Sequence, residues 1–157
     1  MRTGNHRLVQ YKKKMWSGKR HAVGLNIQLV STHDGRLVLT GDPVPGATLD
    51  AKAWHDSGLA ELFTGRLHAP GGPGVIGDLA YVGTGVLTGR KRRPGQQLSI
   101  SERELNHAIN SRRACVERAI AHLRNWTMLA TGYRGLLSRF TANLQLITRL
   151  ELHHTWT

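Results

Sequence analysis

The sequence is short of cysteine and of long apolar stretches, and each shortage excludes a class of protein. Cys115 is the single cysteine among 157 residues. One cysteine cannot form an intrachain disulfide, so a disulfide-stapled fold is excluded and a reducing cytosolic compartment is favoured. The apolar runs are too short for a transmembrane helix, and Met1 opens a basic, polar segment rather than a signal peptide. We therefore expect a globular cytoplasmic chain.

Acidic residues are scarce as well. The chain has 10 Asp and Glu against 22 Lys and Arg, a formal net charge of +12. Its length suits one domain with a hydrophobic core, although only 39% of the residues are apolar. This charge favours a polyanionic partner, with nucleic acid first and an anionic membrane second. No basic amphipathic segment pairs its charges with a wide apolar face, which disfavours the membrane.

The basic side chains gather in three places along the chain. A single cluster is often only a solvated surface, but three in one small domain favour an electrostatic footprint for nucleic acid. The clusters are Lys12, Lys13, Lys14, Lys19 and Arg20; then Arg90, Lys91, Arg92 and Arg93; then Arg112, Arg113, Arg118 and Arg124.

Hydrophobic periodicity predicts the element order β-β-α-β-α-α, a mixed α/β architecture. Alternation over residues 22–30 predicts a strand that buries Val23, Leu25, Ile27 and Leu29, and a turn at 33–35 pairs it with a second strand at 36–40. Helices are expected over 48–63, 101–126 and 134–152, with a short buried strand at 75–76. Ser101 and Glu104 have the spacing of a capping box for the second helix.

Several well-known chemical motifs are absent, which makes the few acids more informative. The sequence contains no GxxxxGK[ST] phosphate loop, no HExxH and no paired-cysteine zinc spacing. Asp78 follows the short apolar strand, and Glu117 lies in a helix beside Val116. Taken separately, the safer interpretation of Asp78 is a strand-end turn acid, and that of Glu117 is an intrahelical ion pair with Arg113. Both interpretations stay open on the residues alone.

Together these segments resemble DDE superfamily transposases of the Harbinger-like and related bacterial insertion-sequence group. GDLAY at 77–81 resembles the motif of the second catalytic aspartate, and CVERAIAHLRNW at 115–126 resembles the helix that bears the catalytic glutamate. WSGKRH at 16–21, PGATLD at 45–50 and YR at 133–134 resemble further family segments, in the family's order. Leu49 replaces the family's usual histidine, and Ala80 replaces a glycine.

The resemblance implies a ribonuclease H-like mixed sheet flanked by helices, and phosphodiester cleavage and strand transfer with Mg²⁺ (or Mn²⁺). It makes Asp78 and Glu117 the catalytic residues and metal ligands. The family's first aspartate precedes the segment at 16–21, whereas the earliest acid here is Asp34. We therefore expect a basic N-terminal segment, 1–15, and a catalytic domain, 16–157, that lacks its N-terminal part and first strand.

The remaining assignments leave alternatives. Asp50 is a candidate accessory acid, but its position also suits the start of a helix. A catalytically inactive remnant could bind DNA through its basic clusters alone, and a sheet without its first strand could pair with another copy or a complementing transposase chain. The expected DNA contacts are Lys19, Arg20, Arg92, Arg93, Arg113 and Arg124.

Overall fold

The structure is a computed structural model that describes residues 13–18, 21–67, 69–72 and 74–156, without the side chain of Arg113. Six short strands come first: β1 (Trp16–Ser17), β2 (Ala22–Val23), β3 (Leu25–Asn26), β4 (Leu29–Ser31), β5 (Leu37–Thr40) and β6 (Val44–Pro45). The helices that follow are α2 (Asp50–Asp56), α3 (Leu59–Phe63), η1 (Leu79–Tyr81), α4 (Ile100–Ser111), α5 (Arg113–Leu123), α6 (Thr127–Ala130), η2 (Leu137–Arg139) and α7 (Phe140–Trp156).

The strands form three two-stranded antiparallel sheets, β1–β2, β3–β6 and β4–β5. The predicted hairpin is confirmed in β4–β5, where Leu29 pairs with Thr40 and Val30 with Leu39. The single strand predicted over 22–30 is wrong, because the segment divides into β2, β3 and β4 with different partners. Its predicted buried face is also wrong: Val23 is 56% exposed, while Gln28 is only 5% exposed.

The helix predicted over 48–63 is interrupted by Gly58, whose φ of +79° ends α2 and begins α3. Such a backbone conformation favours glycine, which has no Cβ. Across this break Trp54 stacks on Phe63 with ring centroids 5.7 Å apart. Together with Leu59 and Val86 these rings form one buried cluster. Leu62 of the same segment stays outside this cluster and is exposed.

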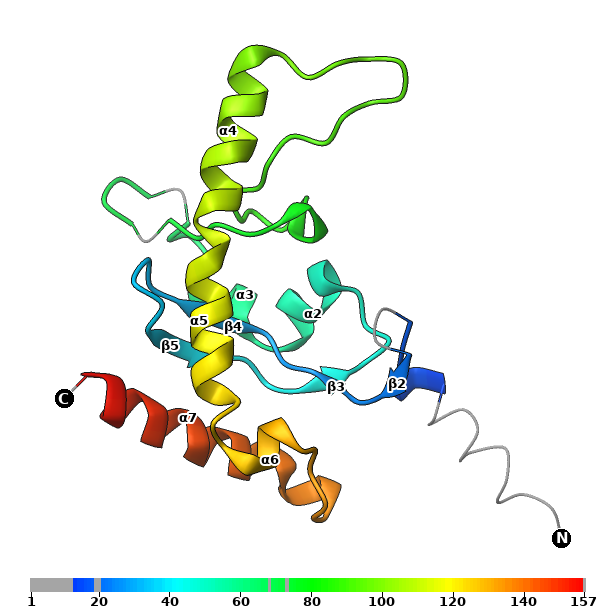
Figure 1. Cartoon of the computed structure of the whole chain (residues 1–157), viewed down its shortest axis with the longest axis vertical. Helices are drawn as coiled ribbons and strands as arrows, with labels where there is room; N and C mark the ends of the chain where they lie inside the picture. Colours follow the sequence, from blue (N-terminus) through cyan, green and yellow to red (C-terminus); the bar gives the residue numbers. More distant parts are fainter. Residues whose placement is uncertain (1–12, 19–20, 68, 73, 157) are drawn as a thin grey trace, which may run out of the picture.

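The long helix predicted over 101–126 is two helices that meet at Arg112 (Figure 1). The predicted capping box is displaced by two residues: Ser99, not Ser101, is the N-cap of α4, and its hydroxyl accepts from the Glu102 amide at 3.2 Å. The Glu102 carboxylate accepts in return from the Ser99 amide and from the Ser99 hydroxyl, and these two hydrogen bonds hold the Glu102 pKa below its usual value.

A second buried cluster joins β5, α5 and α7 through Leu37, Leu123 and Ile147. In Figure 1, α5 lies alongside β4 and α7 alongside β5, in agreement with the contacts between these elements. Glu151 of α7 is buried, and its carboxylate accepts from the Trp126 indole at 3.0 Å. The helix predicted over 134–152 is confirmed as α7, although α7 begins at Phe140.

The mixed helix-and-sheet class is confirmed, whereas the ribonuclease H-like sheet stays a prediction. The described strands form only two-stranded antiparallel sheets. The one parallel pairing among the described residues is an isolated bridge between Ile76 and Leu87. Among the described residues, no helix has both the length and the apolar character needed to cross a membrane.

Candidate active site around Asp50, Asp78 and Glu117

Asp78 stands where the short apolar segment 75–76 ends. The strand predicted there is reduced to the bridge with Leu87, whose N–H donates to the Val75 carbonyl at 2.9 Å. Asp78 then caps η1, since its Oδ1 accepts from the Ala80 amide at 2.8 Å. The turn-acid interpretation of Asp78 is thus confirmed, and the half-buried carboxylate keeps some exposure to solvent.

Asp50 is the first residue of α2, as the helix-start interpretation expected. Its carboxylate also faces β3 and the residues after it. Asn26 Nδ2 donates to Asp50 Oδ1 at 3.1 Å, and Gln28 Nε2 lies 3.5 Å from the same oxygen. The two amides are joined to each other, because Gln28 Nε2 donates to Asn26 Oδ1 at 2.8 Å.

Tyr81 connects this network to the loop that carries Asp78. Its hydroxyl donates to Gln28 Oε1, and its ring meets Trp54 edge-on. The pKa of Tyr81 is raised to about 12, first by burial and then by the negative charges of Asp50 and Asp78. Since α2, which begins at Asp50, contacts η1, which Asp78 caps, Asp50 and Asp78 lie in the same part of the molecule.

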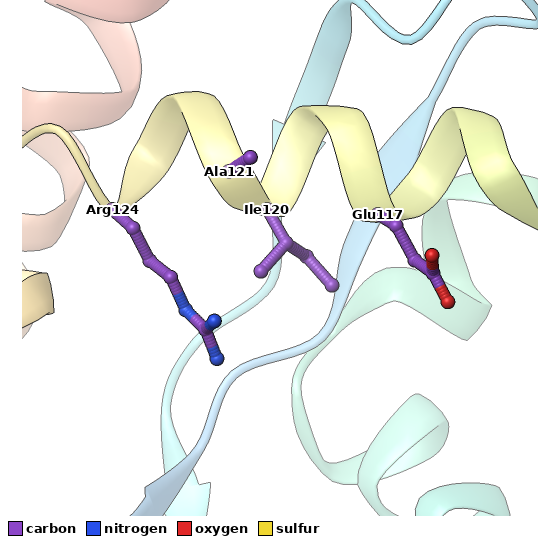
Figure 2. Close-up of a pocket in the computed structure, with 4 residues that line it drawn as sticks. All are labelled: Glu117, Ile120, Ala121 and Arg124. Carbon is purple, nitrogen blue, oxygen red and sulfur yellow. The ribbon is translucent and has the colours of Figure 1, made fainter.

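Glu117 projects from the middle of α5. Its place beside the apolar Val116 predicts a position at the border of the core, but the structure corrects this prediction, because Glu117 is exposed. It lines a pocket with Ile120, Ala121 and Arg124. Figure 2 shows Glu117, Ile120 and Arg124 extending from the same side of the helix, with the carboxylate and the guanidinium at opposite ends. A cation and an anion could therefore be held along one helix face.

The turn of the β4–β5 hairpin fixes α5 in place. Arg118 Nη1 donates to the Asp34 carbonyl at 2.7 Å, and Cys115 Sγ donates to the carbonyl of His33. Cys115 is half-buried and its thiol is not in a disulfide. The residues on either side of Glu117 in the helix sequence therefore attach the helix to the sheet.

The expected DNA contacts are spread over the molecule. Arg92 and Arg93 are exposed in the connection before α4, and Arg124 is exposed at the end of α5. Lys19, Arg20 and the side chain of Arg113 lie outside what the structure describes. The intrahelical pairing of Glu117 with Arg113 thus stays a prediction.

The donor chemistry suits a hard divalent cation, because Asp50, Asp78 and Glu117 offer only oxygen. Within the described part of the chain, however, no three His, Cys, Asp or Glu side chains come close enough together to hold a metal ion. The described residues therefore include side chains of the type that bind such a cation, but these side chains do not form an assembled metal centre.

Comparison with known sequences decides the family. Residues 6–150 match the family described as DDE superfamily endonuclease, a span that includes all three acids. The chain belongs to the DDE superfamily of endonucleases. This confirms the resemblance, and endonucleases of this superfamily generally use divalent metals.

One curated relative of this DDE superfamily chain is a protein named as a transposase for insertion sequence element IS112 in Streptomyces albus G. It is 34% identical over 113 residues, which cover 71% of this chain and 41% of the relative. The chain thus spans about two fifths of that relative's length. No solved structure matches the chain.

Sequence reasoning missed Asn26, Gln28 and Tyr81. Alternation along the strand assigned both amides to the solvent face, because the pattern carries no information about what later packs there. One signal was available: Tyr81 closes the GDLAY segment, and a tyrosine hydroxyl near an acid needs a polar partner when it is buried.

Proposed function

We propose that this chain carries part of the catalytic centre of an insertion-sequence transposase, which cleaves DNA phosphodiester bonds and transfers strands in a metal-dependent reaction. The observation that carries the proposal is the position of the two motif acids within the family match. Asp78 is half-buried at the end of the 75–76 segment, and Glu117 is exposed in a pocket beside Arg124. Both carboxylates are accessible to a ligand.

In this proposal Asp78 and Glu117 hold a divalent cation, with Asp50 as an accessory acid. A divalent cation bound there would supply charge to polarise a phosphate oxygen and to activate a water or 3′-hydroxyl. Arg124, on the same side of α5 as Glu117, would draw a phosphate toward the carboxylate. The family's first aspartate has no counterpart among the motifs of this sequence, so we propose that another segment or a complementing transposase chain supplies it.

The proposed partners are the DNA ends of a mobile element and its target, held through backbone phosphates in the bacterial cytoplasm at the nucleoid. The charge of +12 supports this, because phosphate contacts dominate nucleic-acid affinity. The exposed Arg92 and Arg93 are the strongest candidates among the described residues.

The direct test is nicking of supercoiled plasmid by the purified chain with Mg²⁺ or Mn²⁺. We expect slow metal-dependent nicking that Asp78→Asn or Glu117→Gln reduces by at least about 100-fold, since each removes a ligand charge. Glu61→Gln is the matched control, because Glu61 is an exposed acid on α3 outside the proposed site. It should nick as the wild type does.

The inactive remnant gives a different result. Such a chain would bind DNA with a steep salt dependence. The plasmid would stay supercoiled with or without metal, for the wild type and for both acid substitutions. If nicking is observed and persists unchanged in both Asp78→Asn and Glu117→Gln, the assignment of these acids is wrong.

A further inference from the structure

We propose that Asn106 is a positioning residue, which holds residues 90–93 against α4 so that Arg92 and Arg93 meet DNA phosphates in one fixed arrangement. We call residues 90–93 the basic loop, since all four are arginine or lysine and all four are exposed. The inference rests on the proposed function, which makes DNA the partner, and extends it to a neutral residue outside the motifs described above.

The side chain of Asn106 pairs with the backbone of Arg90. The Arg90 N–H donates to Asn106 Oδ1 at 2.7 Å, and Asn106 Nδ2 donates to the Arg90 carbonyl at 3.0 Å. A side-chain amide that pairs in this way occupies the donor and the acceptor of one residue together, as a neighbouring strand does. The basic loop therefore starts at a fixed place on α4, although residues 88–93 belong to no helix or strand.

The glycine before this contact allows the close approach. A Cβ at Gly89 would lie 2.5 Å from Asn106 Oδ1, so a larger residue would displace the amide from the Arg90 backbone. Gly89 is not among the glycines with positive φ, so a Cβ would meet this steric conflict without backbone strain. The close approach is thus a second observation, independent of the two hydrogen bonds, that the loop and the helix are fitted to each other.

The connection is also fixed after the basic loop. A turn over residues 93–96 reverses the chain, and in it the Gln96 N–H donates to the Arg93 carbonyl at 3.1 Å. Ser99 then begins α4 through its capping box. Figure 1 shows this connection running out beside α4 and returning to the start of the helix. Because Asn106 and the cap attach both ends to the same helix, the basic loop has a defined position on α4.

The charge of this region suits a polyanion. Residues 79–101 include no Asp or Glu, and Arg103 adds an exposed positive charge on α4. The first acid that follows, Glu102, is engaged by hydrogen bonds from Ser99. A loop that is already ordered does not lose backbone freedom when it binds, so its arginines bind phosphates more tightly than those of a flexible loop. Asn106 itself has no charge to offer a phosphate.

The experiment measures binding of the full chain to a fluorescein-labelled DNA duplex by fluorescence anisotropy at low salt. Asn106→Ala removes no charge, yet we expect it to weaken binding about fivefold to tenfold, because the basic loop must then be ordered on binding. Asn110→Ala is the matched control, since Asn110 is an exposed residue one turn further along α4. Its affinity should equal that of the wild type.

Gly89→Ala tests the same contact from the loop and leaves α4 unchanged. Its Cβ should displace the Asn106 amide, so we expect a loss of affinity similar to that of Asn106→Ala. Gly74→Ala is its control, because nothing lies within 4 Å of the position of that Cβ and Gly74 has no positive φ. Wild-type affinity in both Asn106→Ala and Gly89→Ala would overturn the inference.

A double-mutant cycle separates positioning from a general effect on the fold. In a chain that already carries Arg92→Ala and Arg93→Ala, Asn106→Ala should change the affinity by less than about twofold, because the arginines that it positions are gone. If Asn106→Ala weakens binding equally in both backgrounds, its effect does not pass through these arginines and the inference is wrong.

The arginine variant also distinguishes this inference from the function on which it rests. If Arg92→Ala with Arg93→Ala weakens binding while Asn106→Ala and Gly89→Ala leave it unchanged, only the positioning role is overturned. If the arginine variant binds DNA as the wild type does, the proposed DNA contacts fail, and the inference fails with them.

Discussion

At the scale of single residues, Tyr81 links the aromatic core to the candidate site. Its ring makes a T-shaped contact with the Trp54 ring, while its hydroxyl enters the polar network that ends at Asp50. A side chain with an apolar body and a polar tip is suited to such a boundary. Gly77 contributes here, because a Cβ at that position would lie 3.0 Å from the Tyr81 ring and 2.9 Å from Val86.

The raised pKa of Tyr81 leads to a pH prediction. Its folded-state pKa is about 12 against an ordinary 10.0, so the protonated phenol favours the folded state. The contribution is complete below pH 10 and is lost as the pH rises from 10 toward 12. In urea unfolding between pH 8 and 11, Tyr81→Phe should therefore lose less stability with rising pH than the wild type.

Tyr133→Phe is the control for this measurement. Tyr133 is also half-buried and its hydroxyl donates to the Leu136 carbonyl, but it takes no part in the hydrogen bonds that join Tyr81 to Gln28. This variant should keep the wild-type alkaline loss. An unchanged alkaline loss in Tyr81→Phe would contradict the assignment of the effect to the phenol.

At the scale of elements, the packing of α5 against the β4–β5 turn determines where Glu117 lies. Gly35 has φ of +86°, and a Cβ there would lie 2.8 Å from Arg118 Cδ and 3.1 Å from the Cys115 carbonyl. Gly35→Ala therefore introduces two costs, a strained backbone and a clash with the helix. We expect it to lower the free energy of unfolding by about 2–4 kcal/mol.

Gly95→Ala separates these costs in the same denaturation experiment. Gly95 has a similar φ of +76°, but nothing lies within 4 Å of the position of its Cβ. Gly95→Ala should therefore lower the free energy of unfolding only by the cost of the strained backbone, about 1–2 kcal/mol. Equal effects of the two substitutions would show that the turn does not support α5.

At the scale of the whole molecule, exposed arginines lie toward both ends of the long axis. Arg92 and Arg93 lie in the connection that runs out beside α4, whereas α7 lies at the other end of the long axis (Figure 1). If the DNA follows the α4 end, Arg92→Ala with Arg93→Ala should reduce the slope of log affinity against log salt by about 1.8.

The matched control replaces two arginines at the other end, Arg139 and Arg149, which are also exposed. It removes the same charge and should leave the slope nearly unchanged in a fluorescence-anisotropy titration. If both double variants reduce the salt slope equally, DNA has no preferred binding face, and the prediction is wrong.

The sequence by itself determined the family, the mixed α/β class, the β4–β5 hairpin and the positions of the principal acids. These follow from local signals: motif residues at close spacing, period-two alternation, and a turn with Asp34 and Gly35. Such features involve neighbours in the chain, so they can be read without knowing what packs against them. The cap at Ser99 was missed by two residues because two serines there have compatible spacing.

Only the tertiary structure decided that the strand over 22–30 breaks into three, that Gln28 is buried, and that Asp50 and Asp78 lie in the same part of the molecule. Gln28 is covered because Asp50 and Tyr81 come from segments 22 and 53 residues further along the chain. Hydrogen bonds over such separations satisfy a polar side chain that its local pattern assigns to solvent. The physical reason is that burial depends on the partner surface, and a one-dimensional pattern does not contain that surface.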